Sequence, residues 1–183
     1  DTNGGTLPDE VHMILSEVLD KYPESKFGVH FQNDNGCAVA NSMVAVELGV
    51  DHVQGTINGY GERTGNADLC TLIPNLSLKK SYETISEDSL SKLTQIANHI
   101  AELVNVAIDS RHPYVGSSAF THKAGLHASG MAKDNVLYEH IDSSKVGNFT
   151  RTTVSELAGR ASVITKAQEF GLTLDNEEAK KTY

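Results

Sequence analysis

Tryptophan is absent from the sequence, cysteine occurs only twice, and no apolar run approaches the ~20 residues needed to cross a bilayer. The two cysteines, Cys37 and Cys70, form no C-x-x-C pair and suggest no disulfide framework. No signal peptide opens the chain. These absences argue against a membrane or secreted protein, and we expect a cytoplasmic protein in a reducing compartment.

Basic residues are also scarce: 15 Lys and Arg stand against 24 Asp and Glu, which gives a net charge of −9. They occur mostly singly, without a run or stripe. Because binding of nucleic acid requires clustered Lys and Arg, we expect no nucleic-acid partner. The 183 residues are enough for one domain with a sizeable core, or for one domain and an appendage.

The first part of the chain alternates between helical and strand patterns. We predict, in order, a helix over 8–20, a strand over 26–31, a helix over 37–49 and a strand over 51–57. A Gly-rich loop then leads into another helix that runs towards Lys80. The strands begin about 25 residues apart, near the repeat of a (β/α)8 barrel. The pattern therefore predicts an α/β fold, a partial TIM (β/α)8 barrel.

The pattern changes from Ser86 onwards. Residues 86–108 place leucines, isoleucine and alanines on one helical stripe, with Ser86 as the expected N-cap. Beyond His112 the chain is rich in glycine and serine, and the pattern places no regular element there. We expect a mainly helical linker subdomain after the barrel.

Polar side chains follow three successive strand ends, where parallel βα sheets gather their functional groups. They are Thr2 and Asn3, then His30 and Gln32, then Glu62, Arg63 and Asn66. A hydrogen-bonded core histidine is the ordinary alternative for His30. Three polar strand ends on one rim favour a site instead. The glycines of "GYGERTG" do not have the spacing of a dinucleotide loop.

Four motifs occur in the order expected of one enzyme family: "HFQND", "ANS", "GYGERTGN" and "THKAGLH". Together they resemble the metal-dependent, pyruvate carboxyltransferase-like family of citramalate, 2-isopropylmalate and homocitrate synthases. The last motif is most similar to the citramalate synthases. The resemblance implies an acyltransferase that condenses acetyl-CoA with an α-keto acid, most closely pyruvate, on the route to isoleucine and leucine. It also implies small-molecule substrates, no membrane partner and a homodimer.

The resemblance implies a divalent metal held by His30, the residue at position 32, and Asn66. The family motif is H-x-H-N-D, whereas this chain has Gln32 in place of the second histidine. A glutamine oxygen suits hard cations and is a poorer partner for zinc than imidazole, so we expect Mn²⁺ or Mg²⁺ rather than Zn²⁺. A weakened or oxygen-preferring metal site is favoured over outright loss of the site, and the remaining alternative is that Gln32 only hydrogen-bonds inside the barrel.

Other roles follow from the resemblance alone. Thr2 is similar to the threonine that holds the substrate carboxylate, and His127 and Tyr138 are similar to residues that reach the partner subunit's active site. Glu62 is a candidate catalytic residue. A buried ion pair between Glu62 and Arg63 is an equally favoured interpretation.

We expect three regions: the C-terminal part of a catalytic barrel over 1–84, a post-barrel helix and capping subdomain over 85–150, and the start of a second linker subdomain over 151–183. The family's first metal ligand, in a D-R-E motif, and its general base lie upstream and are not in this sequence. We therefore expect a fragment that is inactive alone. A 2-isopropylmalate or homocitrate synthase, or a degenerate regulatory module without activity, are the alternatives.

Overall fold

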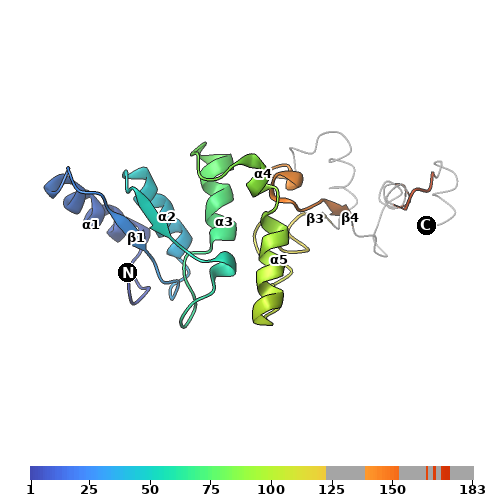
Figure 1. Cartoon of the computed structure of the whole chain (residues 1–183), viewed down its shortest axis with the longest axis horizontal. Helices are drawn as coiled ribbons and strands as arrows, with labels where there is room; N and C mark the ends of the chain where they lie inside the picture. Colours follow the sequence, from blue (N-terminus) through green and yellow to red (C-terminus); the bar gives the residue numbers. More distant parts are fainter. Residues whose placement is uncertain (123–138, 153–163, 165–166, 168–169, 174–183) are drawn as a thin grey trace. The chain divides into compact units, whose positions relative to one another are not determined.

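The computed structural model describes residues 1–122, 139–152, 164, 167 and 170–173 (Figure 1). His127 and Tyr138 lie outside these residues. The chain divides into two units, Asp1–Ile108 and Asp109–Tyr183. Among the described residues, no helix has both the length and the apolar character needed to span a membrane.

The first unit is built on two short parallel strands, β1 (Gly28–His30) and β2 (His52–Gln54). Helix α1 (Pro8–Lys21) precedes β1, and helix α2 (Ala38–Glu47) crosses from β1 to β2. The register pairs Val29 with Val53 and His30 with Gln54. This confirms the predicted helix–strand–helix–strand order and the parallel pairing, although both strands are shorter than predicted.

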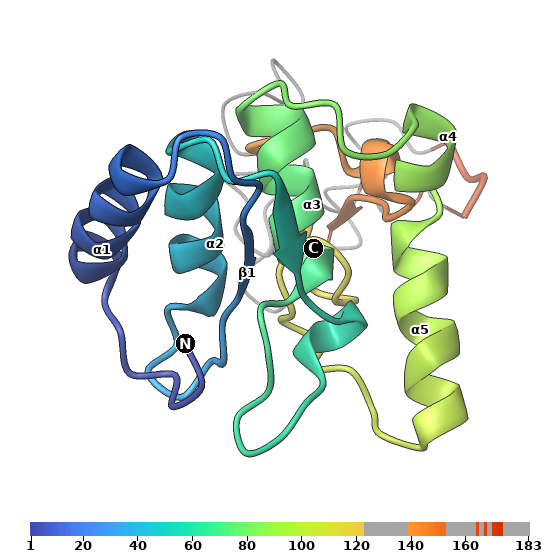
Figure 2. The same cartoon turned by 60° about the vertical axis from the view of Figure 1, so that its left-hand side comes forward.

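The core of this unit lies between the strands and the helices α1 and α2 (Figure 2). Val11 of α1, Ala38 and Ala45 of α2, and Phe31 just after β1 are all buried in it. Side chains alternate along a strand, so Val29 and Phe31 face the helices while His30 faces away and is exposed. The polar face of β1 is therefore the face that the helices leave open.

Local signals explain where the helices begin and end. At the start of α1 the Leu7 N–H donates to the Glu10 carboxylate at 2.8 Å. After β2 a 3-10 turn, η1 (Ile57–Gly59), leads into the Gly-rich loop, and α3 (Leu69–Pro74) begins where the Asp68 carboxylate accepts from the Cys70 N–H. A π-helical turn, η2 (Asn75–Lys79), continues α3.

The predicted helix over 86–108 is in fact two helices, α4 (Glu87–Leu90) and α5 (Leu93–Val104). Ser86 caps α4 as predicted, because its hydroxyl accepts from the Ser89 N–H. α5 ends where Asn105 adopts a left-handed conformation. The apolar stripe is buried at Leu90 and Leu93, whereas Leu103 is 68% exposed.

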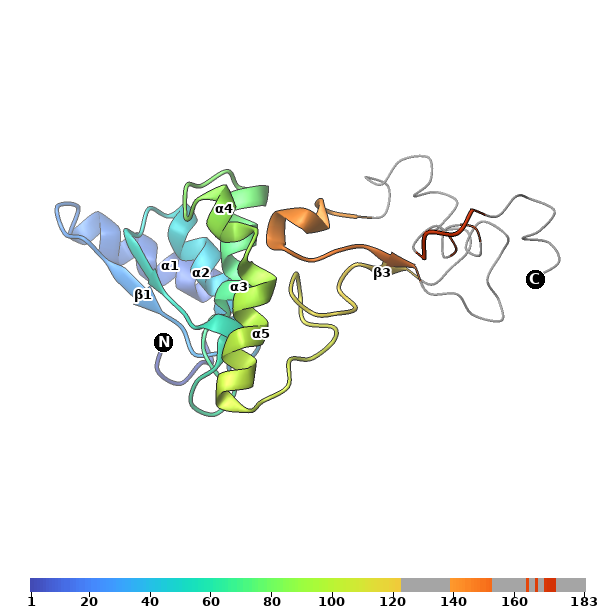
Figure 3. The ribbon, with the colours of Figure 1, turned by 45° about the vertical axis from the view of Figure 1, so that its right-hand side comes forward.

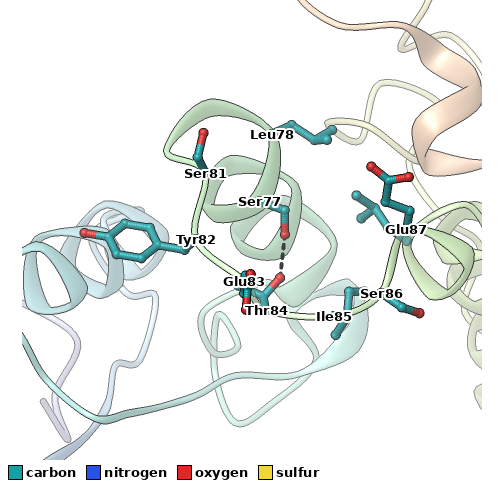
Figure 4. Close-up of a pocket in the computed structure, with 10 residues that line it drawn as sticks. Ser77, Leu78, Ser81, Tyr82, Glu83, Thr84, Ile85, Ser86 and Glu87 are labelled. Carbon is teal, nitrogen blue, oxygen red and sulfur yellow. Dashed lines mark hydrogen bonds between the residues drawn. The ribbon is translucent and has the colours of Figure 1, made fainter.

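A hollow of about 750 Å³ lies beyond the C-terminal end of α3 (Figure 4). Hydroxyl groups line much of it, and the Ser77 and Thr84 hydroxyls lie 2.5 Å apart. The described candidate site residues, Thr2, His30, Gln32, Glu62 and Asn66, do not line this hollow and precede α3 in the chain.

The second unit contains a small parallel pair, β3 (Thr121–His122) and β4 (Arg151–Thr152), which the sequence pattern did not predict (Figure 3). A 3-10 turn, η4 (Ser143–Val146), lies between them in the chain. The buried Asn148 amide donates to the carbonyls of Tyr114 and Gly116 at 2.9 and 3.0 Å. These bonds connect residues more than 30 positions apart, which local sequence signals do not reveal.

Candidate active site

Three chain segments meet beside the C-terminal end of β1, as the polar strand ends predicted. The N-terminal amine of Asp1 donates to the His30 carbonyl at 2.8 Å, and the Gln32 N–H donates to the Asp1 carbonyl at 3.3 Å. On the other side, the Asn33 N–H donates to the Gly65 carbonyl at 2.9 Å. The segment after β1 is therefore held between the first residues and the Gly-rich loop.

Gln32 and Asn66 lie directly opposite each other in an isolated antiparallel bridge. The hydrogen bonds of this bridge run between flanking residues, from Asn33 N–H to the Gly65 carbonyl and from Ala67 N–H to the Phe31 carbonyl. In such a non-hydrogen-bonded pair the two side chains share one face and approach closely. The two amide groups therefore lie side by side, on the face of the chain that also carries His30.

Both amide oxygens of this pair are buried and lack a donor. Among the described residues, neither Gln32 Oε1 nor Asn66 Oδ1 has a hydrogen-bond partner. A buried acceptor without a donor costs roughly 1–3 kcal/mol, so such atoms call for an explanation. Within the described residues, then, Gln32 Oε1 accepts no hydrogen bond and His30 is exposed.

Two unpaired amide oxygens and a nearby imidazole suit a hard divalent cation, which prefers oxygen ligands. Within the described residues no group of three or more His, Cys, Asp and Glu side chains could hold a metal ion. His30, Gln32 and Asn66 carry no negative charge themselves. The carboxylate that the family resemblance places upstream, together with an anionic ligand such as an α-keto acid, would balance the charge of the ion.

The Arg63 guanidinium connects the three segments. It donates from Nε to Asp34 Oδ1 at 2.7 Å, and from Nη2 to Asp34 Oδ2 at 3.0 Å and to the Thr2 carbonyl at 2.9 Å. A two-pronged bond of this kind fixes direction as well as distance. We call this set of contacts between Arg63, Asp34 and the Thr2 carbonyl the arginine clamp.

The predicted ion pair between Glu62 and Arg63 is present, but it is not buried. Glu62 Oε2 lies 3.5 Å from Arg63 Nη1, but its side chain is 78% exposed and that of Arg63 is 39% exposed. The principal partner of Arg63 is Asp34. Glu62 is therefore an exposed carboxylate on the Gly-rich loop, in a long ion pair with Arg63.

Thr2 stands at the same edge in an exposed turn. The Asp1 carboxylate accepts from the N–H groups of Gly4 and Thr6 at 3.1 and 3.0 Å, which closes the turn. Gly4 packs directly on Asp34, because a Cβ at Gly4 would lie 2.1 Å from Asp34 Oδ2. The sequence pattern did not identify Asp34 as the residue that contacts both Gly4 and Arg63. The glycines of "DTNGG" were the available signal, because a glycine allows another residue to approach the backbone closely.

Replacing Arg63 with methionine should raise the pKa of the Asp34 carboxyl towards its ordinary value. The hydrogen bond from Arg63 is the main cause that lowers this pKa. Because the folded-state pKa is lowered, the clamp is complete above the ordinary carboxyl pKa and is lost as the pH falls through the lowered value. Titration of the Asp34 carboxyl by ¹³C NMR measures this directly.

Glu62→Gln is the control for that titration. Glu62 is largely exposed, and its carboxylate contacts Arg63 at 3.5 Å, a longer distance than that between Asp34 and Arg63. The Asp34 pKa of Glu62→Gln should match that of the unmodified protein. An Asp34 pKa that is unchanged in Arg63→Met would contradict the arginine clamp.

Parallel strands covered by helices on one face, with polar groups gathered where the strands end, define the class of α/β-barrel enzymes. Residues 1–100 match the HMGL-like family, and residues 114–183 match the homocitrate synthase post-HMGL domain-like family. The chain belongs to the HMGL-like family. Its fold is accordingly a partial TIM barrel followed by a second unit.

Known relatives agree with this assignment. The chain is 49% identical over 183 residues to the (R)-citramalate synthase of Aquifex aeolicus, covering 99% of this chain and 35% of that protein. It is 35% identical over 178 residues to a probable 2-isopropylmalate synthase of Methanopyrus kandleri, covering 97% of this chain and 35% of that protein. The chain thus spans about a third of the length of these curated relatives.

A solved structure shares the fold. The HMG-CoA lyase of Bacillus subtilis superposes with a TM-score of 0.52 at 26% identity, over 61% of this chain and 38% of the lyase.

Proposed function

We propose that this chain supplies part of the active site of a citramalate synthase, an acyltransferase that condenses acetyl-CoA with pyruvate. The observation that carries the proposal is the 49% identity over nearly the whole chain to an (R)-citramalate synthase, against 35% to a probable 2-isopropylmalate synthase. The paired oxygens of Gln32 and Asn66, which have no donor in the part of the chain that the structure describes, support it, because the condensation uses a metal-bound keto acid.

In the reaction, the methyl carbon of acetyl-CoA loses a proton and bonds to the keto carbon, whose oxygen takes up a proton. Water then cleaves the thioester and releases coenzyme A, which makes the condensation irreversible. A divalent cation bound at His30, Gln32 and Asn66 would polarise the keto carbonyl and stabilise the developing alkoxide.

The chain's own residues bind and orient the reactants around that centre. Thr2 would hold the keto-acid carboxylate, and its carbonyl is held by the arginine clamp. The exposed Glu62 carboxylate can accept or donate a proton at the rim. We assign His127 and Tyr138, outside the described residues, to the acetyl-CoA side, contributed across a homodimer.

The substrate assignment is tested with the enzyme that carries these residues together with the rest of the barrel. Release of coenzyme A should be fastest with pyruvate as the keto acid. Faster release with 2-oxoisovalerate or with 2-oxoglutarate would replace the proposal by a 2-isopropylmalate or a homocitrate synthase. No release with any keto acid would favour a degenerate, non-catalytic module, the function class that Gln32 in place of histidine also suggests.

The metal preference follows from Gln32. Mn²⁺ or Mg²⁺ should support higher activity than Zn²⁺ in the metal-stripped enzyme, because an amide oxygen matches hard cations better than zinc. Gln32→His should strengthen Zn²⁺ binding by about tenfold or more, since imidazole is the better zinc ligand. Isothermal titration with each ion measures both effects.

Gln32→Met is the matched control, because it keeps the length of the side chain and removes the oxygen. It should weaken Mn²⁺ binding. Equal Mn²⁺ affinity in Gln32→Met would show that the residue at position 32 is not a metal ligand, and highest activity with Zn²⁺ in the unmodified enzyme would count against the proposed ligand set.

A further inference from the structure

We propose that Thr56 is a positioning residue that sets the orientation of the Asn66 amide through the Tyr60 carbonyl. The inference rests on the proposed metal site, and it assigns to Thr56 a role that the sequence pattern did not. The three residues belong to one loop, which leaves β2 at Thr56 and returns beside β1 at Asn66.

The Tyr60 carbonyl accepts two hydrogen bonds. One comes from the Thr56 hydroxyl at 2.5 Å, and the other from Asn66 Nδ2 at 3.0 Å. A carbonyl oxygen has two lone pairs, so these two donors satisfy it completely. Thr56 and Asn66 are thereby linked through one acceptor, although ten positions separate them in the chain.

This acceptor decides which way the Asn66 amide faces. An amide side chain presents an NH₂ group on one side and an oxygen on the other. Because the Tyr60 carbonyl can only accept, it must face the NH₂ group, and Asn66 Oδ1 must point the other way. That is the oxygen which is buried without a donor beside Gln32, where the metal is proposed to bind.

Thr56 itself is fixed independently of the loop. Its N–H donates to the Ala67 carbonyl at 3.0 Å, and its carbonyl accepts from the Leu69 N–H at 2.9 Å. These bonds anchor Thr56 beside the segment in which Asn66 lies. Its hydroxyl is therefore a fixed donor that holds the Tyr60 carbonyl in position.

The backbone of the loop between Thr56 and Asn66 has several left-handed residues, so a fixed donor helps to hold its conformation. Asn58 and Arg63 have left-handed backbones, and Gly59 and Gly65 have φ values of +67° and +93°. Gly61 packs directly on the amide, since a Cβ there would lie 2.5 Å from Asn66 Nδ2. Without the Thr56 hydroxyl, the Tyr60 peptide would keep one of its two bonds and could rotate, so that the amide would lose its fixed direction.

Thr56→Val tests the role, because valine keeps the branched shape and removes only the hydroxyl. We expect Mn²⁺ affinity of the metal-stripped enzyme, measured by titration calorimetry, to fall by about 10- to 100-fold, as for other residues that orient a metal ligand. Thr56→Ser retains the hydroxyl and should bind Mn²⁺ nearly as well as the unmodified enzyme.

Thr71→Val is the matched control, because the Thr71 hydroxyl donates to Asp68 Oδ2 at 2.6 Å in α3, away from Tyr60. It removes one hydroxyl hydrogen bond, so its Tm should fall, but its Mn²⁺ affinity should not change. A merely structural Thr56 would behave in the same way. Unchanged Mn²⁺ affinity in Thr56→Val would therefore overturn the inference.

Two further variants keep the result decisive. Asn66→Ala separates the proposed metal site from the proposed role of Thr56. Unchanged Mn²⁺ affinity in Asn66→Ala would mean that the metal site is wrong. Weaker binding in Asn66→Ala but not in Thr56→Val would mean that only the positioning role of Thr56 is wrong. If Thr56→Val does not fold, Gly61→Ala replaces it, because the added methyl group displaces the same amide. Full Mn²⁺ affinity in Gly61→Ala would overturn the inference, and a loss like that of Asn66→Ala would support it.

Discussion

Gly65→Ala should destabilise the first unit by about 3 kcal/mol, the sum of a left-handed backbone cost of roughly 1–2 kcal/mol and an overpacking cost of roughly 1–3 kcal/mol. Gly65 has a φ of +93°, and a Cβ there would lie 1.9 Å from the Gly59 carbonyl oxygen. That oxygen is backbone and also accepts from the Asn66 N–H at 3.0 Å. The methyl group would therefore displace the bond that holds the proposed metal ligand, and denaturant unfolding measures the loss.

Gly36→Ala separates the two costs. Gly36 has a φ of +78°, but a Cβ there would meet nothing within 4 Å. It should lose only the conformational part, about 1 kcal/mol. If Gly65→Ala and Gly36→Ala have the same free energy of unfolding, the close approach of Gly65 to the Gly59 carbonyl is not present in solution.

The elements of the first unit were predictable because their signals are local. Apolar spacing and Pro8 mark α1, and the polar strand ends mark the edge where Thr2, His30 and Asn66 gather. The break between α4 and α5 was not predictable from the apolar stripe. Leu90 and Leu93 keep the apolar spacing on either side of Ser91 and Lys92, but the backbone leaves the helix at these two polar residues.

The details of the site depend on contacts between distant residues. Glu62 and Arg63 are neighbours in the sequence, which suggested an ion pair; Arg63 has a left-handed backbone with a φ of +57°, and its guanidinium contacts Glu62 at 3.5 Å but makes its shorter bonds to Asp34. Asp34 lies 29 positions away. The pairing of Gln32 with Asn66 likewise joins residues 34 positions apart, and within the described residues neither amide oxygen has a donor.

His127→Ala should reduce turnover by roughly 10²-fold or more in the enzyme that contains the complete barrel, which is the usual contribution of an acid–base group. We base this on the proposed role of His127 in removing the proton from acetyl-CoA. Pyruvate binding and Tm should stay nearly unchanged, because the imidazole would act on the other substrate. His99→Ala is the control, since His99 is exposed on α5, and it should retain full turnover.

The homodimer proposal adds a sharper expectation. If His127 acts on the barrel of the partner subunit, mixing His127→Ala with the metal-site variant His30→Ala produces hybrid dimers. In such a dimer, one active site combines the intact His30 of the first subunit with the intact His127 of the second. The mixture should therefore recover activity that neither variant has alone, up to about a quarter of normal for random exchange of subunits in a two-fold dimer. Inactive hybrids, with subunit exchange confirmed by native mass spectrometry, would mean that His127 serves its own barrel; normal turnover of His127→Ala alone would remove it from the reaction altogether.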